Sequence, residues 1–247
     1  MKALLRWVAL VLMALVALQL FFVLRIAAMV VIDPQSTSFQ RSEIWTQILS
    51  MGRGGELHWR QQWLPYQQIA ESLKRAVIAS EDDGFVNHDG VDWNAIEKAW
   101  DRNNRAEELA AKASARAPDR PVRAAKIRGG STITQQLAKN LLLSGERTML
   151  RKGQEFVLTL LLERMLSKQR ILEIYLNSVE WGDGVFGAEA AAQRYYKKSA
   201  SRLSNQEAAR LAVMLPAPKR FEKNPGSAYI AGRTRTIMGR MSSAELP

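Results

Sequence analysis

The sequence lacks cysteine altogether and has only two histidines, His58 and His88, among its 247 residues. The missing thiols exclude a disulfide framework and any thiolate site. Two histidines without cysteine argue against a histidine-based metal centre, so we expect no bound metal. The hydrophobic content of 47% is still enough for one sizeable domain with a buried core that needs neither metals nor disulfides.

Acidic residues are the second shortage, with 24 Asp and Glu against 35 Lys and Arg and a net charge of +11. This balance favours a polyanionic partner, which could be nucleic acid, anionic lipid or a phosphate-bearing substrate. The first 32 residues help to decide among these partners.

Charged residues are absent from Trp7 to Leu24, and after Arg25 the apolar run resumes as far as Ile32. As a helix, residues 7–24 alone would span about 27 Å, close to the ~30 Å hydrocarbon core of a bilayer. We therefore expect residues 1–32 to form a cytoplasmic tip and an uncleaved transmembrane anchor. A cleaved signal peptide is the alternative, but its apolar run would be shorter and would end at a small-x-small site.

The charges that flank this span predict its orientation. Lys2 and Arg6 lie just before it, so the positive-inside rule places the N-terminus in the cytoplasm and the domain on the outer face of the inner (plasma) membrane. A domain held there meets anionic phospholipids and lipid-linked pyrophosphates, and we expect no nucleic-acid partner.

The rest of the chain predicts a mostly α domain. Residues 33–64 are expected to be a connector with amphipathic pieces, with a solvated linker as the alternative, and residues 65–247 form the domain. Residues 101–128 have little apolar periodicity and contain two prolines, which predicts a mobile basic loop whose Ala/Glu-rich half is left open as a helix. No alternating pattern predicts a strand. Helices are expected from Pro65 towards Ser80 and at about 93–100, 132–142, 151–166, 168–176, 187–196, 204–215 and 227–241.

Glu81 is the first candidate for chemistry. It lies four residues after Val77, on the same face of the expected helix as the apolar stripe. Desolvation there would raise the pKa of its carboxyl group, as a general base or acid near neutral pH requires. The alternative is an acidic cluster in water at the end of a helix. We expect His88 to be structural and hydrogen-bonded to a nearby carboxylate.

Two further segments carry polar and cationic residues at helical spacing. Thr132 and Gln135 fit a capping box after a glycine-rich turn, and the helix N-terminus there could receive a phosphate. Ordinary capping is the alternative. Lys152 and Glu155 lie three residues apart, with Arg147 nearby, and such cations can neutralise a pyrophosphate without a metal. The alternative is a surface ion pair worth under ~0.5 kcal/mol.

Taken in order, these segments resemble the peptidoglycan glycosyltransferases of glycosyltransferase family 51. The resemblance covers about residues 65–225, although the stretch 101–128 is longer than the family pattern suggests. No Ser-x-x-Lys occurs in the sequence, so a monofunctional enzyme without a penicillin-binding transpeptidase domain is expected. The matching motifs are Glu81-Asp82-x-x-Phe85-x-x-His88-x-Gly90-x-Asp92, Gly130-Ser131-Thr132-Ile133-Thr134-Gln135-Gln136-Leu137-Ala138-Lys139-Asn140, Arg151-Lys152-x-x-Glu155 and Ile171-Leu172-Glu173-Ile174-Tyr175-Leu176-Asn177.

The resemblance implies a lysozyme-like fold with a smaller membrane-facing lobe, and an enzyme that polymerises lipid II in cell wall biosynthesis. The configuration at MurNAc C1 inverts and undecaprenyl pyrophosphate leaves. Glu81 is implied as general base and Glu155 as a second important carboxylate, near the acceptor or the pyrophosphate. The residues implied in binding the substrate or shaping its site are Asp82, Phe85, His88, Ser131, Thr132, Gln136, Lys139, Asn140, Arg147 and Lys152.

The expected partners are lipid II, the lipid-linked nascent glycan and membrane phospholipids. Other cell-wall synthesis or division proteins are left open as partners. No tightly bound cofactor is expected, and a divalent cation that assists the departing pyrophosphate is left open. Two rival interpretations are a glycan-cleaving hydrolase or lytic transglycosylase and a non-catalytic scaffold that binds anionic lipid.

Overall fold

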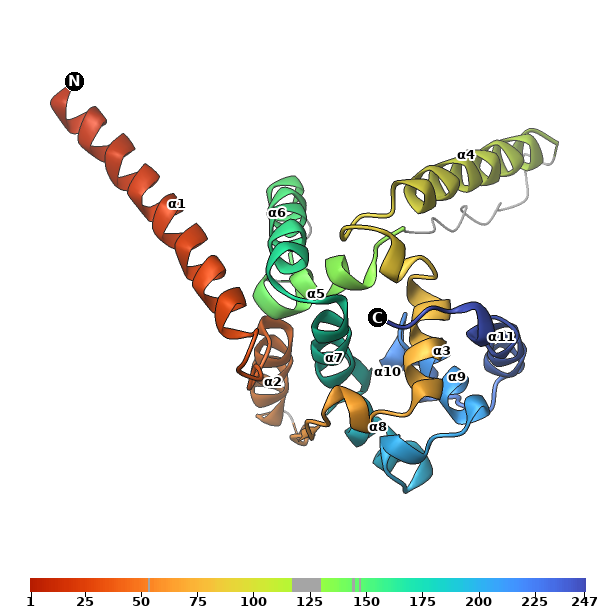
Figure 1. Ribbon diagram of the computed structural model, residues 1–247. Coiled ribbons are helices and arrows are strands. Elements are labelled where there is room, and N and C mark those ends of the chain that lie inside the picture. The colour runs from red at the N-terminus through yellow and green to blue at the C-terminus, as the bar shows by residue number, and fades with distance from the viewer. Residues whose placement is uncertain (53, 117–129, 144, 147) are drawn as a thin grey trace.

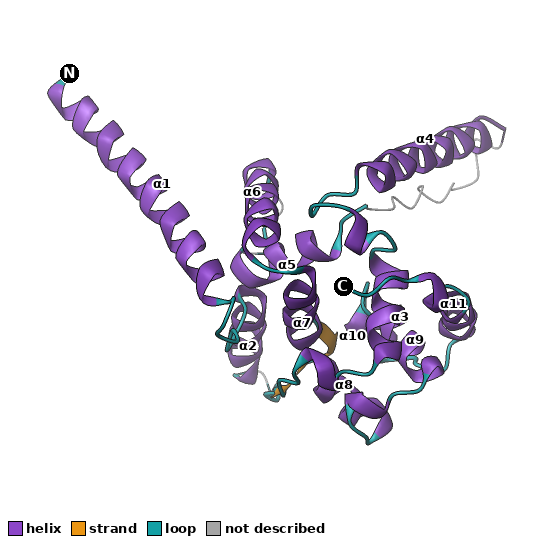
Figure 2. Ribbon diagram, viewed as in Figure 1, coloured by secondary structure: helices purple, strands orange, loops and turns teal. Residues whose placement is uncertain are grey.

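The computed structural model describes residues 1–247 except 53, 117–129, 144 and 147. Over these residues the expected mostly α fold with one N-terminal apolar helix is confirmed (Figure 2). The helices are α1 (Lys2–Ala28), α2 (Ser38–Met51), α3 (Glu71–Glu81), α4 (Trp93–Arg116), α5 (Ile133–Leu142), α6 (Met149–Met165), α7 (Lys168–Ser178), α8 (Ala188–Tyr196), α9 (Asn205–Met214), α10 (Pro218–Phe221) and α11 (Ala228–Met238).

A small three-stranded sheet was not expected from the sequence. Its strands are β1 (Arg60–Gln61), β2 (Glu180–Gly182) and β3 (Val185–Phe186), in the order β1-β3-β2. β1 is parallel to β3, and β2 is antiparallel to β3 with an irregular register. Strands of two or three residues are too short to show an alternating pattern, which explains why they were not predicted.

The helices of the body pack in two groups that share one core. α3 packs against α9, and α9 packs against α11, while α5 contacts both α6 and α7. Figure 1 shows that α1 and α4 extend away from this body. Helix starts are fixed locally, because Thr132, Thr148, Ser167 and Ser204 each accept a hydrogen bond from an N–H group of the first turn that follows.

Helix α1 is long and apolar enough to cross a membrane, by length and composition. Most of its side chains are exposed, whereas Phe22 and Ile26 near its end are buried. Arg170 of α7 holds the chain that follows, because its Nε donates to the Met29 carbonyl and its guanidinium lies 2.7 Å from the Asp33 carboxylate. The end of the apolar helix is therefore fixed to the domain.

Helix α2 fills the first half of the expected connector and is docked on the domain. The Ser38 hydroxyl donates to the Leu141 carbonyl, and the Gln40 side chain donates to the Ser178 carbonyl. The large apolar side chains Trp45 and Leu49 instead point outward, each 62% exposed. This segment is not a solvated linker.

Helix α4 corrects the expectation of a loop that begins at residue 101. It continues without interruption from Trp93 to Arg116, and residues 117–128 of the expected loop lie outside the described part of the chain. The Ala/Glu-rich half, which was left open as a helix, is helical. Alanine and glutamate favour a helix even where no apolar stripe packs against a core.

Candidate active site

Glu81 ends α3, whose stripe of Leu73 and Val77 is fully buried. Its Oε2 accepts a hydrogen bond of 3.0 Å from Nε2 of Gln136, and its Oε1 has a longer contact of 3.4 Å with the Ser80 hydroxyl. Burial raises the pKa of Glu81, while the hydrogen bonds from Gln136 and Ser80 and the charge of Arg233 oppose that rise. The carboxylate therefore has the partly desolvated environment that its spacing from Val77 predicts.

Asp82 joins the first two sequence motifs. Its Oδ1 lies 2.8 Å from Nε2 of His88, and its Oδ2 accepts a hydrogen bond from the backbone N–H of Ile133 at the start of α5. Asp82 and Phe85 are both buried, so they form part of the framework of the turn that follows Glu81. His88 therefore makes the hydrogen bond to a nearby carboxylate that was expected of it.

Thr132 forms the expected capping box at the start of α5. Its hydroxyl accepts from the N–H of Gln135 and donates to the Gly90 carbonyl, and the residue is buried. Since Asp82 already occupies the N–H of Ile133, protein groups take up N–H groups that a phosphate at this terminus would need. Protein groups therefore occupy the start of α5, where a phosphate was expected as one possibility.

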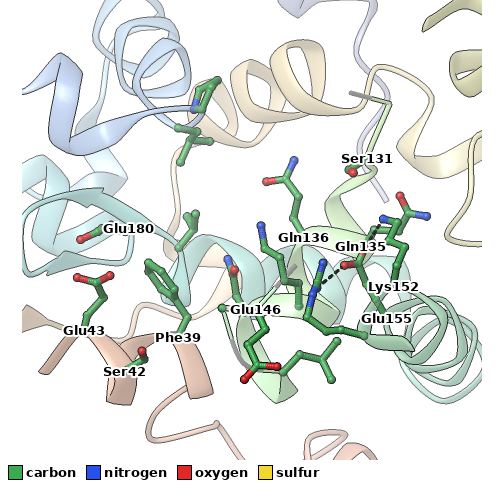
Figure 3. Close-up of a pocket in the computed structure, with 18 of the residues that line it drawn as sticks. Phe39, Ser42, Glu43, Ser131, Gln135, Gln136, Glu146, Lys152, Glu155 and Glu180 are labelled. Carbon is green, nitrogen blue, oxygen red and sulfur yellow. Dashed lines mark hydrogen bonds and ion pairs between the residues drawn. The ribbon is translucent and has the colours of Figure 1, made fainter. Parts of the chain in front are cut away.

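A cavity of about 800 Å³ opens beside α5 and α6 (Figure 3). Gln136 links it to Glu81, which is not itself part of the lining. The Thr132 side chain is not part of the lining either. Arg147 lies outside the described residues. The other residues that the resemblance assigned to substrate or catalysis and that line this cavity are Ser131, Gln136, Lys139, Asn140, Lys152 and Glu155.

Glu155 lies between two cations on α6. Its Oε2 accepts from Nη1 of Arg151 at 2.9 Å, and its Oε1 accepts from the ammonium group of Lys152. Glu155 is 3% exposed, whereas the Lys152 side chain is 49% exposed. The two cations offset the cost of burying the carboxylate, and Lys152 keeps a face towards the cavity. Arg151 was not among the residues assigned to the site, although it belongs to the same motif.

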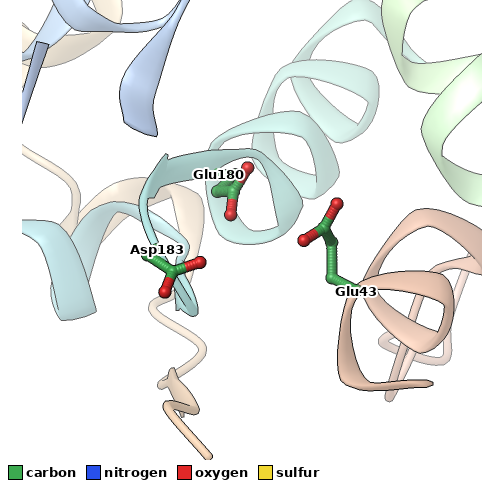
Figure 4. Close-up of side chains that lie close together, drawn as sticks. All are labelled: Glu43, Glu180 and Asp183. Carbon is green, nitrogen blue, oxygen red and sulfur yellow. The ribbon is translucent and has the colours of Figure 1, made fainter. Parts of the chain in front are cut away.

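The opposite end of the cavity is acidic, which was not expected from the sequence. Glu43 of α2, Glu180 of β2 and the nearby Asp183 bring carboxylate oxygens within 4.8 Å of one another (Figure 4). The ammonium group of Lys219 contacts Glu43 and lies 3.5 Å from Glu180 and 3.3 Å from Asp183. Burial raises the pKa of Glu180 to about 7 against the opposing charge of Lys219.

Comparisons with known proteins agree with the resemblance in the motifs. Residues 50–242 match the family described as Transglycosylase. Three relatives carry the name biosynthetic peptidoglycan transglycosylase. The protein from Paraburkholderia xenovorans is 49% identical over 98% of this chain and 94% of its own length. The one from Herminiimonas arsenicoxydans is 49% identical over 100% and 99%, and the one from Burkholderia thailandensis is 51% identical over 94% and 82%.

The family match covers the whole body of the domain, from the end of α2 to the end of α11. It includes Glu81, the capped α5 and the paired Lys152 and Glu155. The match is also consistent with the expected lysozyme-like character of the helical domain. The chain therefore belongs to the transglycosylase family, among the biosynthetic peptidoglycan transglycosylases.

Proposed function

We propose that this peptidoglycan glycosyltransferase polymerises lipid II at a membrane surface. The growing lipid-linked strand is the donor, and the GlcNAc 4-hydroxyl of lipid II attacks C1 of the donor MurNAc. The configuration inverts and undecaprenyl pyrophosphate leaves. The observation that carries the proposal is the link between a desolvated carboxylate and a cation-lined cavity through the side chain of Gln136.

Glu81 is the general base in this proposal. Burial raises the pKa of its carboxyl group, so the ionised form is a stronger base than an ordinary glutamate. Gln136 holds Oε2, and the long contact at Oε1 leaves that oxygen the better placed of the two to accept a proton from a sugar hydroxyl. Asp82 and His88 keep the turn after α3 in place behind it.

Lys139, Lys152 and Arg151 supply the positive charge that a departing pyrophosphate needs. Lys139 and Lys152 come from different helices and line the same cavity, and Arg151 accompanies them on α6. Cations aimed at developing negative charge lower the barrier because they are already oriented before the reaction. The proposal needs no tightly bound cofactor, since side chains supply this charge.

Helix α1 anchors the enzyme in this proposal, with the N-terminus in the cytoplasm and the domain on the outer face of the membrane. Both reactants carry lipid chains, so an anchored enzyme and its substrates share one surface. Arg170 supports this arrangement because it ties the end of α1 to α7. The exposed apolar side chains along α1 are suited to contact with phospholipid.

The test is polymerisation of purified lipid II by the full chain in detergent or vesicles. Glu81→Gln keeps the size of the side chain and the contact with Gln136 but removes the base, so we expect glycan formation to fall by roughly 10²–10⁴-fold. Glu71→Gln is the matched control, because Glu71 lies on the same helix with an exposed side chain. Retained polymerisation in the Glu81 variant would overturn the assignment, and shortening of existing peptidoglycan without new strands would indicate a hydrolase.

A further inference from the structure

Tyr175 of α7 reaches Glu81 through one intervening side chain. Its hydroxyl donates a hydrogen bond of 3.0 Å to Oε1 of Gln136, and Nε2 of the same amide donates to Glu81 at 3.0 Å. Tyr175 is fully buried. Its segment, residues 171–177, belongs to the fourth sequence motif, which the proposed chemistry has not used.

The orientation of the Gln136 amide decides whether Glu81 receives a donor. A carboxylate only accepts hydrogen bonds, so an ionised Glu81 needs the NH₂ end of the amide and is repelled by its oxygen. Rotating the amide by half a turn would place that oxygen against Glu81. Something must therefore hold the oxygen of Gln136 on the other side.

Tyr175 is suited to hold it there. Burial, together with the negative charges of Glu81 and Asp82, raises the pKa of Tyr175 well above its usual value, so the phenol keeps its proton. Among the described residues, Oε1 of Gln136 is the acceptor recorded for this hydroxyl. In the rotated orientation the buried O–H would face an NH₂ group and lose that acceptor, which is unfavourable away from water.

We propose that Tyr175 is a positioning residue, which fixes the Gln136 amide so that it donates to Glu81 and keeps that carboxylate ionised and aimed. The inference rests on the proposed role of Glu81 as base. Other charged groups act on Glu81 as well: Arg233 of α11 favours the ionised form, and the neighbouring Asp82 opposes it. Substitution of Tyr175 leaves both of these in place.

The experiment measures the pH dependence of lipid II polymerisation by full-length Tyr175→Phe. Phenylalanine fills the same space and removes one oxygen. With the amide free to rotate, Glu81 loses a donor to its charged form, so the acidic limb of kcat should move to higher pH by about half a unit or more. The KM for lipid II should change less than kcat.

Tyr195→Phe is the matched control. The Tyr195 hydroxyl donates to the Trp181 carbonyl and does not contact Glu81 or Gln136. This variant should keep the acidic limb of the unmodified protein. If Tyr175→Phe also keeps that limb, its hydroxyl is only structural and the inference is overturned.

A double-mutant cycle gives an independent decision. Gln136→Leu removes the amide through which Tyr175 acts, so adding Tyr175→Phe to it should shift the acidic limb no further. If Tyr175→Phe shifts the acidic limb as far in the Gln136→Leu background as it does alone, Tyr175 does not act through Gln136 and the inference is overturned. The proposed function is tested separately, because retained polymerisation in Glu81→Gln would overturn it. If Glu81→Gln is inactive but Tyr175→Phe leaves the acidic limb of kcat unchanged, only the role of Tyr175 is overturned.

Discussion

The two ends of the cavity bury the same chemical group in opposite surroundings. Glu155 and Glu180 are 3% and 6% exposed. Glu155 lies between Arg151 and Lys152, whereas Glu180 shares the single ammonium group of Lys219 with two other carboxylates. Burial alone therefore does not decide how a carboxylate behaves here. The ratio of cations to carboxylates around each buried carboxylate decides how well its negative charge is offset.

This difference makes one end of the cavity positively charged and the other end negatively charged. At the Glu155 end the two cations that contact this carboxylate outnumber it, so the cluster carries a net positive charge. At the Glu180 end three carboxylates surround one cation. Charges about 4 Å apart near a protein surface interact by ~4 kcal/mol, so the first end attracts an anionic group and the second end repels it.

The largest effect should come from removing the carboxylate between two cations. In Glu155→Gln, Arg151 and Lys152 lose their counter-charge, and Arg151 is itself largely buried with its Nε already lacking a hydrogen bond. We expect the free energy of unfolding to fall by about 3–4 kcal/mol, measured by chemical denaturation in detergent. The exposed Glu71→Gln should cost under ~0.5 kcal/mol. If Glu155→Gln and Glu71→Gln lowered the free energy of unfolding equally, the buried charge cluster around Glu155 would contribute no more than an exposed ion pair.

Removing the carboxylate of Glu180 at the other end should raise the free energy of unfolding instead of lowering it. The folded-state pKa of Glu180, about 7, lies above its ordinary value of 4.5, so the proton stabilises the folded protein below pH 4.5 and that stability is lost as the pH rises through 7. Glu180→Gln stays neutral at every pH. We expect it to be more stable than the unmodified protein by about 2 kcal/mol at pH 8.5 and equally stable near pH 4.

Thermal melts of both proteins across this pH range would measure the difference. Lys219 keeps Glu43 and Asp183 as partners in the variant, so the loss of one pairing is partly compensated. A variant that is less stable at pH 8.5 would mean that Lys219 fully neutralises Glu180, and the contrast with Glu155 would disappear.

Local patterns in the sequence were enough to predict the cationic end. The helix expected at 132–142 is observed at Ile133–Leu142, because the capping box and the apolar spacing both lie within it. Lys152 and Glu155 share a helix, so their three-residue spacing alone brings them together. Gln136 meets Glu81 across two helices, and this contact was not predicted: the resemblance assigned both residues to the site without pairing them.

The acidic end could not be predicted in this way. Glu43, Glu180 and Lys219 come from α2, β2 and α10, and no local period relates positions so far apart in the chain. The short strand β2 that carries Glu180 has no alternating pattern either.

The length of α4 was missed for a different reason. Trp93, Ile96 and Trp100 predicted only its first two turns, and the part that follows is rich in alanine and charged residues without a continued apolar period. That part extends away from the body of the protein.

The smallest effect on stability should come from Lys152→Met, which sharpens the comparison within the cationic end. The Lys152 side chain is half exposed and Arg151 remains paired with Glu155, so we expect a change under ~0.5 kcal/mol in the free energy of unfolding. The proposed function places Lys152 near the departing pyrophosphate, so we expect lipid II turnover to fall about tenfold nevertheless. The exposed Lys223→Met controls for the loss of one surface charge. If Lys152→Met destabilised the protein as strongly as Glu155→Gln, Lys152 rather than Arg151 would be the main counter-charge of Glu155, and its role in binding substrate would be secondary.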